Sequence, residues 1–213
     1  MPVLNMAELN RKQREHLAHR QEILSSAEKV FAAKGFFPTT MSEIARVAEF
    51  GTGTLYKVFK SKEELYFTLI DEKVEEINRL VKAELSRKVS AIERIQKALG
   101  LQFKFIEQNR DFFRIYISER NRFEWTVKDE LGRRMHDKMV AYIRILAQVI
   151  KEGMKQGELK SMDPVDLAHA LVGMVNSFVF EWLISPKSYP LMIKLDTVLE
   201  IFLRGSQQKE RRR

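Results

Sequence analysis

The stretch Thr40–Leu65, which reads TMSEIARVAEFGTGTLYKVFKSKEEL, decides the fold. Thr40 and Glu43 have the spacing of a capping box, in which each side chain accepts a hydrogen bond from the other residue's amide. The short helix that follows stops at a tight turn, Glu49-Phe50-Gly51, and a second short helix runs from about Thr52 to Val58. Two short helices joined by such a turn are typical of a helix-turn-helix unit, whose second helix can enter the DNA major groove.

Helical patterns continue on both sides of this stretch. Apolar residues near a 3.6-residue period predict a first helix from about Asn10 to Lys34, which Gly35 ends. A long helix is expected from about 127 to 155. A further helix is expected after it, with Asp163 as its N-cap and Pro164 as its first residue. Only five prolines and nine glycines occur, without a sustained period-2 run. We therefore predict an all-α fold of about nine helices.

Composition limits the class of protein and its partners. Of 213 residues, 45% are hydrophobic and 31% charged, which is typical of a folded globular chain. The absence of cysteine excludes disulfides, thiolate zinc sites and cysteine nucleophiles. No apolar signal segment follows the first residues, and the most apolar stretch, 170–184, is interrupted by Asn176 and Glu181. We therefore expect a cytoplasmic protein without a membrane partner.

Positive charge is concentrated in the N-terminal quarter. The formal net charge is +8, of which residues 1–62 contribute +4, from ten Lys/Arg against six Glu. The last residues, 208–213, add +3, so the remaining chain is nearly neutral. A basic head of this kind favours a phosphate-bearing partner, although solvated helix faces and a basic tail give the same balance.

Many positions at fixed spacing resemble one known family. Across about residues 20–66 the chain is similar to the DNA-binding region of TetR/AcrR transcriptional regulators. The resemblance implies a homodimer that represses transcription from a palindromic operator on double-stranded DNA. It also implies a C-terminal ligand pocket and a dimer interface built by the last two helices. The domains would be 10–62 (helix-turn-helix), 63–206 (ligand binding and dimerisation) and 207–213 (basic tail). The matching residues are Ile23, Ala27, Val30, Phe31, Gly35, Thr39, Thr40, Ile44, Ala45, Ala48, Gly53, Thr54, Leu55, Tyr56, Phe59 and Ser61 to Leu65.

Candidate DNA contacts come from residue chemistry and from the resemblance together. Small residues at the front of the second short helix allow a close approach to bases, and its threonine methyls can contact thymine. A phenol or an ammonium group suits phosphate oxygens. The resemblance implies phosphate contacts for Thr40, Tyr56 and Lys62. It implies positions near bases for Ser42, Thr52, Gly53 and Thr54. The complete set is Thr40, Ser42, Thr52, Gly53, Thr54, Tyr56, Lys57 and Lys62.

Three positions depart from the family pattern. Glu49 stands where the turn usually has glycine, and a positive φ there would cost about 1 kcal/mol. Gly51 can cap the second helix but supplies no side-chain acceptor. Val58 replaces a residue that often touches phosphate, so one contact is expected to be missing.

The C-terminal part is dense in aromatic residues and methionines, most of which we expect in the core. A pocket between the helices would be lined by the same residue types and a few polar groups, and it would take an apolar or aromatic effector. The last two helices each carry a broad apolar face, which either closes the domain or meets a second copy. The candidate pocket residues are Phe103, Tyr116, Trp125, Met139, Asn176, Phe178 and Trp182, with Arg120 or His136 as polar contacts.

An enzyme is the first alternative class. His16–His19 and Asp166–His169 have metal-compatible spacing on a helix, but paired Glu-x-x-His motifs, phosphate-binding glycine loops and nucleophile elbows are missing. We therefore predict no enzyme activity, no cofactor and no metal site. A helical metal-dependent enzyme remains one alternative, and a helical receptor or scaffold that does not bind DNA remains the other.

Overall fold

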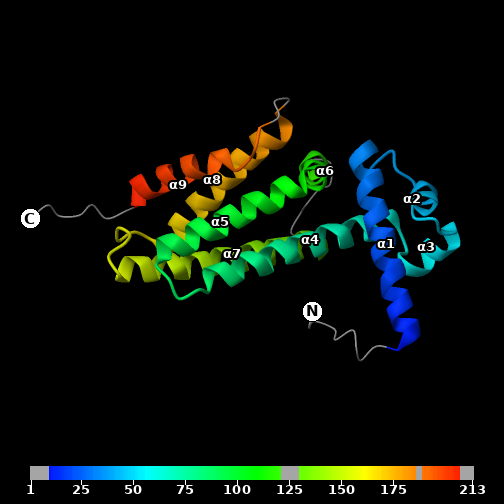
Figure 1. The fold of residues 1–213 in the computed structure, drawn as a ribbon, viewed down its shortest axis with the longest axis horizontal. Helices are drawn as coiled ribbons and strands as arrows, with labels where there is room; N and C mark the ends of the chain where they lie inside the picture. The colour runs from blue at the N-terminus through cyan, green and yellow to red at the C-terminus, as the bar shows by residue number, and fades with distance from the viewer. Residues whose placement is uncertain (1–9, 121–129, 186–188, 207–213) are drawn as a thin grey trace, which may run out of the picture. The chain divides into compact units, whose positions relative to one another are not determined.

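The computed structural model describes residues 10–120, 130–185 and 189–206, and in this part of the chain it contains helices and no β-strand (Figure 1). This confirms the predicted all-α class and the number of helices. The helices are α1 (Arg11–Lys34), α2 (Met41–Val47), α3 (Thr52–Val58), α4 (Lys62–Leu85), α5 (Ala91–Gln108), α6 (Arg110–Arg120), α7 (Glu130–Lys155), α8 (Pro164–Ile184) and α9 (Ile193–Ser206).

Local capping groups set several of these boundaries. Asn10 forms a capping box with Gln13 at the start of α1, and Gly35 ends that helix with a φ of 82°. At the start of α8, the Asp163 carboxylate accepts hydrogen bonds from the amides of Val165 (2.8 Å) and Asp166 (3.1 Å). These side chains satisfy amides that have no partner inside the helix, so the sequence alone locates the helix ends.

The N-terminal unit extends further along α4 than the sequence indicated. Backbone contacts divide the chain between Glu72 and Lys73, inside α4. We predicted the boundary after residue 62, which is the first residue of this helix. The difference arises because the first half of α4 completes the N-terminal core, where Leu65, Tyr66 and Ile70 are buried. The other buried residues of this core include Ile23, Leu24, Ala27, Phe31, Phe36, Ile44, Ala45, Leu55 and Phe59.

The C-terminal unit is built around α7, which packs on α8 and α5. The core between them holds Phe103, Ile150 and Trp182. The indole N–H of Trp182 donates to the backbone carbonyl of Tyr189 at 2.7 Å, so this buried polar group is satisfied. The unit is therefore a continuous helical core.

Helix α8 is more apolar than its sequence segment suggested. It has 21 residues and a mean hydropathy of 1.5, which by length and composition alone would be enough to cross a bilayer. The helix begins at Pro164, earlier than the apolar stretch that we considered from the sequence. Leu171, Val175 and Trp182 face the core, and a core helix of a water-exposed domain has the same composition.

Candidate nucleic-acid interface and effector cavity

The turn between α2 and α3 has the backbone strain that its sequence predicts. Glu49 has a φ of 59°, in the left-handed region that favours glycine. The amide of Phe50 donates to the carbonyl of Ala45 at 3.0 Å, and the Phe50 ring lies edge-on to His19 of α1, with ring centroids 4.9 Å apart. These contacts hold the turn against α1 in spite of the strain at Glu49.

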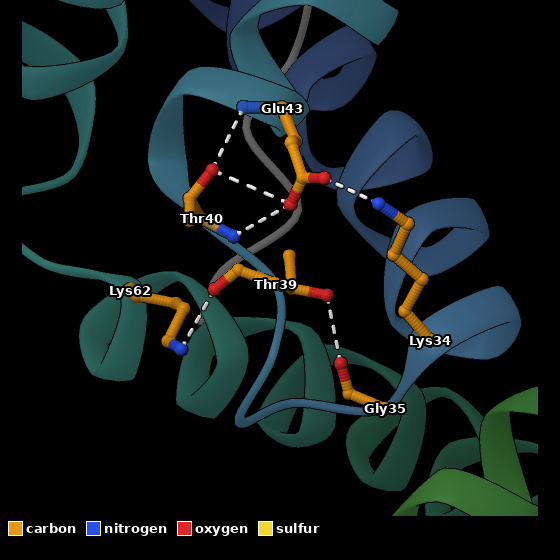
Figure 2. A network of polar contacts seen from close by, with 6 residues as sticks. All are labelled: Lys34, Gly35, Thr39, Thr40, Glu43 and Lys62. Carbon is orange, nitrogen blue, oxygen red and sulfur yellow. Dashed lines mark hydrogen bonds and ion pairs between the residues drawn. The ribbon is translucent and has the colours of Figure 1, made fainter.

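A polar network fixes the start of α2 (Figure 2). The Thr40 hydroxyl accepts from the Glu43 amide at 3.2 Å, and the Glu43 carboxylate accepts from the Thr40 amide at 3.0 Å. Lys34, in the last turn of α1, forms an ion pair with the same carboxylate. The hydrogen bond from Lys34, followed by that from the Thr40 amide, lowers the pKa of Glu43 below its ordinary value of 4.5. Thr40 is thus a helix cap, and α2 is tied to α1.

Lys62 has partners within the protein that the sequence did not reveal. Its ammonium donates to the carbonyl oxygens of Phe36 (2.9 Å), Phe37 (3.1 Å) and Thr39 (2.8 Å), and lies 4.4 Å from the centroid of the Phe36 ring. An ammonium has three N–H donors, so this arrangement uses all of them. We had expected Lys62 at a DNA phosphate. We now leave it out of the proposed DNA contacts, because it closes the loop between α1 and α2.

The other candidates lie on the outer face of α2 and α3. Ser42, Thr52 and Gly53 are exposed, as are Thr40 and Lys57, whereas Thr54 is half-buried. Tyr56 is 52% exposed, which is high for a side chain of its size, so its phenol is available to a partner. The structure therefore presents the expected short, small-residue surface at the start of α3.

Neither packing nor backbone conformation within the protein requires glycine at position 53. A Cβ built at this position would meet nothing within 4 Å, and its φ is not in the left-handed region. The fold would therefore accept alanine here. Glycine at this exposed position also lets another molecule approach the backbone closely.

Arg46 is an exposed cation that sequence reasoning did not single out. It lies four residues after Ser42 on α2, and residues four apart share a helix face. That spacing, read with the expected role of Ser42, could have identified it. Arg46 adds a guanidinium to the outer face of α2, and guanidinium groups bind phosphate well.

The C-terminal unit contains a cavity of about 380 Å³ between α4, α5, α6, α7 and α8. Met139 and Asn176, two of the candidate pocket residues, line it. Phe103 and Trp182 are 0% and 2% exposed and belong to the packed core instead. These two predicted pocket residues thus lie on the helix faces that close the core. The cavity is lined by Val74, Ile77, Asn78, Val81, Gln102, Ile106, Phe113, Ile117, Met135, Lys138, Met139, Tyr142, Val172, Asn176, Val179 and Phe180.

The other predicted pocket residues lie outside the cavity or have side chains outside the described residues. Phe178 packs against the core without lining the cavity, and His136 is exposed outside it. The side chains of Tyr116 and Arg120, and all of Trp125, lie outside the described residues. Of the six predicted residues whose side chains the structure describes, Met139 and Asn176 line this cavity.

Gln102 and Tyr142 supply polar groups that the sequence analysis missed. The Tyr142 hydroxyl lies 3.5 Å from the Gln102 side-chain oxygen. Burial raises the pKa of Tyr142 to about 12, so the phenol keeps its proton at neutral pH. Tyr142 follows Met135 and Met139 at helical spacing, which was the available signal. The cavity therefore offers neutral hydrogen-bonding groups among apolar walls.

Metal ligands do not gather anywhere in residues 10–120, 130–185 and 189–206. The structure brings together no group of three or more His, Asp or Glu side chains that could hold an ion in this part of the chain. The two metal-compatible spacings noted in the sequence, 16–19 and 166–169, thus find no further ligands among the described residues.

Two family models match the chain. Residues 23–69 match the family described as "Bacterial regulatory proteins, tetR family", and residues 88–183 match "Tetracyclin repressor-like, C-terminal domain". The fatty acid metabolism regulator protein of Bacillus subtilis (strain 168) is 25% identical over 189 residues, which is 88% of this chain and 95% of that protein.

Solved structures show the same fold. A candidate fatty acid metabolism regulator from Clostridium perfringens is 28% identical with a TM-score of 0.71, covering 86% of this chain and 97% of its own. The transcriptional regulator FadR from Bacillus subtilis, in complex with stearoyl-CoA, is 24% identical with a TM-score of 0.72, covering 87% and 98%. The two family models cover both units of the chain and agree with the exposed helix-turn-helix surface. The chain therefore belongs to the TetR family of DNA-binding transcriptional regulators.

Proposed function

We propose that this regulator is a homodimeric repressor that binds a palindromic operator through α2 and α3 and is released by an apolar effector. The observation that carries the DNA-binding part is the exposed start of α3, where Gly53 has no packing reason to be glycine. The net charge of +4 on residues 1–62 supports the same assignment. We expect it in the cytoplasm, where operator DNA is accessible.

We assign the exposed residues of α2 and α3 to two kinds of DNA contact, one with bases and one with phosphates. Ser42, Thr52, Gly53 and Thr54 are assigned to bases, where short side chains can read edges in the major groove. Phosphate contacts set affinity and register without reading sequence. They are assigned to Thr40, Arg46, Tyr56 and Lys57.

Substitutions on this surface test the division. Tyr56→Phe should weaken binding to operator and random duplex by similar factors, because it removes a phosphate contact. Thr52→Ala should mainly change base preference in a selection from randomised duplexes. Ser86→Ala, on an exposed loop of the C-terminal unit, is the control. Equal losses for Thr52→Ala on operator and random DNA would contradict the assignment.

The dimer is proposed to form through the outer faces of α8 and α9. The faces that include Leu171 and Phe202 are buried within one chain, so they are not available to a second copy. A different stripe of α8 is exposed at helical spacing, and on α9 the exposed Ile193 and Ile201 continue the apolar surface. A Cβ at Gly173 would meet nothing within 4 Å, so another helix could approach closely there. The α8 stripe is Ala170, Gly173, Ser177, Phe180 and Ile184.

The mass in solution tests this interface. Ile184→Glu should convert the dimer to a monomer in sedimentation equilibrium and abolish tight operator binding, because a charge would be buried at the interface. Ile184 is 61% exposed and does not line the cavity. Met162→Glu is the matched control, since Met162 is 52% exposed but precedes α8. A monomeric wild-type protein at micromolar concentration would refute the proposal.

The effector is proposed to be a fatty acyl compound whose chain occupies the cavity. The apolar walls support this class, as do the names of the relatives that regulate fatty acid metabolism. Such a ligand would act by preferring the dimer conformation that does not fit the operator, which shifts the population. A titration of the operator complex with acyl compounds of several chain lengths tests this, and no release by any of them would contradict it.

A further inference from the structure

The effector cavity is open to solvent on one side. Most of the side chains that line it are buried or half-buried, but three of them are exposed. They are Met139, Asn176 and Phe180, and the exposed fractions of Met139 and Phe180 are 43% and 47%. An apolar ligand in the cavity would therefore keep part of its surface in contact with water beside these residues. We call the three residues the cavity mouth.

Met139 is exposed although it lies on a core face of α7. Ile143, Leu146 and Ile150 follow it at spacings of four, three and four residues, and all three are buried. Such spacings keep side chains on one face of a helix. Within residues 10–120, 130–185 and 189–206 of a single chain, this apolar face is therefore covered along most of its length but incompletely at Met139.

On α8, the cavity mouth lies at the edge of the surface that we propose for dimerisation. Phe180 lines the cavity and also belongs to the α8 stripe. Asn176 lines the cavity too, and it lies three residues after Gly173 and four before Phe180, so the three share a helix face. The cavity wall and the α8 stripe are thus adjacent sides of one helix that meet at Phe180.

A second copy of the chain has room and suitable side chains to cover this edge. A Cβ at Gly173 would meet nothing within 4 Å, so a helix of the second copy can approach α8 closely there. On α9, Ile193, Thr197 and Ile201 are exposed at four-residue spacing and present a largely apolar stripe. None of these three residues lines the cavity of its own chain.

We infer that a second copy of this chain completes the effector cavity, with its α8 and α9 side chains closing the mouth at Met139, Asn176 and Phe180. The inference rests on the proposed dimer surface. It adds that each effector site is shared between two chains, so a single chain contains only part of the site. It concerns the apolar part of the ligand and does not depend on the ligand's head group.

A shared site links effector binding to dimerisation. Removing about 55 Å² of apolar surface at the mouth from water corresponds to about a tenfold gain in affinity. Because linkage is reciprocal and a dimer has two such sites, saturating ligand should strengthen dimerisation about a hundredfold. The effector would therefore release the operator from an intact dimer and would not act by separating the two chains.

Fluorescence titration of the full-length protein with N-phenyl-1-naphthylamine, a neutral apolar probe, tests the inference without DNA. Ile184→Glu and Ile201→Glu each place a charge in the proposed interface, and neither residue lines the cavity. Both variants should be monomers at submicromolar concentration and should bind the probe about tenfold more weakly than the wild-type dimer. In sedimentation equilibrium, saturating probe should raise the dimerisation constant of each variant about a hundredfold.

Two controls locate the effect. Met162→Glu introduces the same charge at a similarly exposed apolar residue before α8, so it should remain dimeric and bind the probe like the wild type. Val172→Phe places a ring in the cavity and should abolish probe binding without changing the mass of the dimer, because Val172 lines the cavity but is outside the α8 stripe. Probe binding that survives Val172→Phe would lie elsewhere and would overturn the inference.

The remaining outcomes separate the shared site from the proposed function. A monomeric variant that binds the probe as tightly as the wild type would show that one chain forms the whole cavity, and the inference would be wrong. It would also be wrong if the wild type bound no probe, or if Ile184→Glu lost affinity and monomeric Ile201→Glu did not. Sedimentation equilibrium without probe tests the proposed function by itself, since variants that stay dimeric would refute the proposed dimer surface.

Discussion

Replacing Lys62 by methionine should loosen the DNA-binding unit while leaving the number of phosphate contacts unchanged. Methionine keeps the length of the side chain but removes the ammonium that donates to the carbonyls of Phe36, Phe37 and Thr39. These carbonyls are partly accessible to water, so we assign about 1 kcal/mol to each bond, below the usual range for charged donors. The contact with the Phe36 ring adds about 0.5 kcal/mol. The expected loss is about 3.5 kcal/mol.

Hydrogen exchange measured by mass spectrometry is the appropriate assay. Both tryptophans, Trp125 and Trp182, lie beyond residue 72, so tryptophan fluorescence would not report on the N-terminal unit. A loss of about 3.5 kcal/mol corresponds to roughly 400-fold faster exchange for protected amides of α2 and α3. Peptides from α5 and α8 should exchange as in the wild type.

The salt dependence of operator binding distinguishes a structural role of Lys62 from a phosphate contact. Lys57→Met removes a proposed phosphate contact, so its slope of log affinity against log salt should fall by about one, with unchanged exchange rates. Lys62→Met should lower affinity with the wild-type slope. If Lys62→Met exchanged like the wild type and lowered the slope by about one, the structural role assigned to Lys62 would be refuted.

Three further predictions concern single positions. Glu49→Gly should stabilise the N-terminal unit by about 1 kcal/mol, since φ is 59°, and slower exchange of the turn amides would register it. Gly153→Ala should destabilise the C-terminal unit by about 1–3 kcal/mol in urea unfolding, because its Cβ would lie 2.7 Å from that of Ala91. Glu43 has a pKa lowered by Lys34, so its stabilising effect is complete above pH 4.5 and is lost as pH falls through the lower folded value. Glu43→Gln should abolish that pH dependence, as measured by exchange across the acid range.

Local signals predicted most of the architecture. Thr40 and Asp163 cap helices through bonds to amides two or three residues away, and such short spacings are visible in a sequence. Gly35 and the α2–α3 turn were visible for the same reason. The class of fold and the DNA-binding surface followed from these signals and from the family resemblance.

Nonlocal packing determined what the sequence could not predict. Lys62 bonds to carbonyls more than twenty residues earlier in the chain, so no short pattern revealed that its ammonium is occupied. Phe103 and Trp182 were expected in a pocket because aromatic residues line pockets and cores alike. Which of the two a residue joins depends on where neighbouring helices fail to pack, and Gln102 and Tyr142 lie at such a place.

The open surroundings of Gly53 have a consequence for how this regulator could diverge. A side chain added there would meet no protein atom, and the same is true of Gly51 just before α3. On the proposed assignment of the start of α3 to DNA, mutations at these sites would alter which promoter is recognised while folding proceeds as before. Gene duplicates of this chain could acquire new targets through such changes without first needing compensatory mutations in the core.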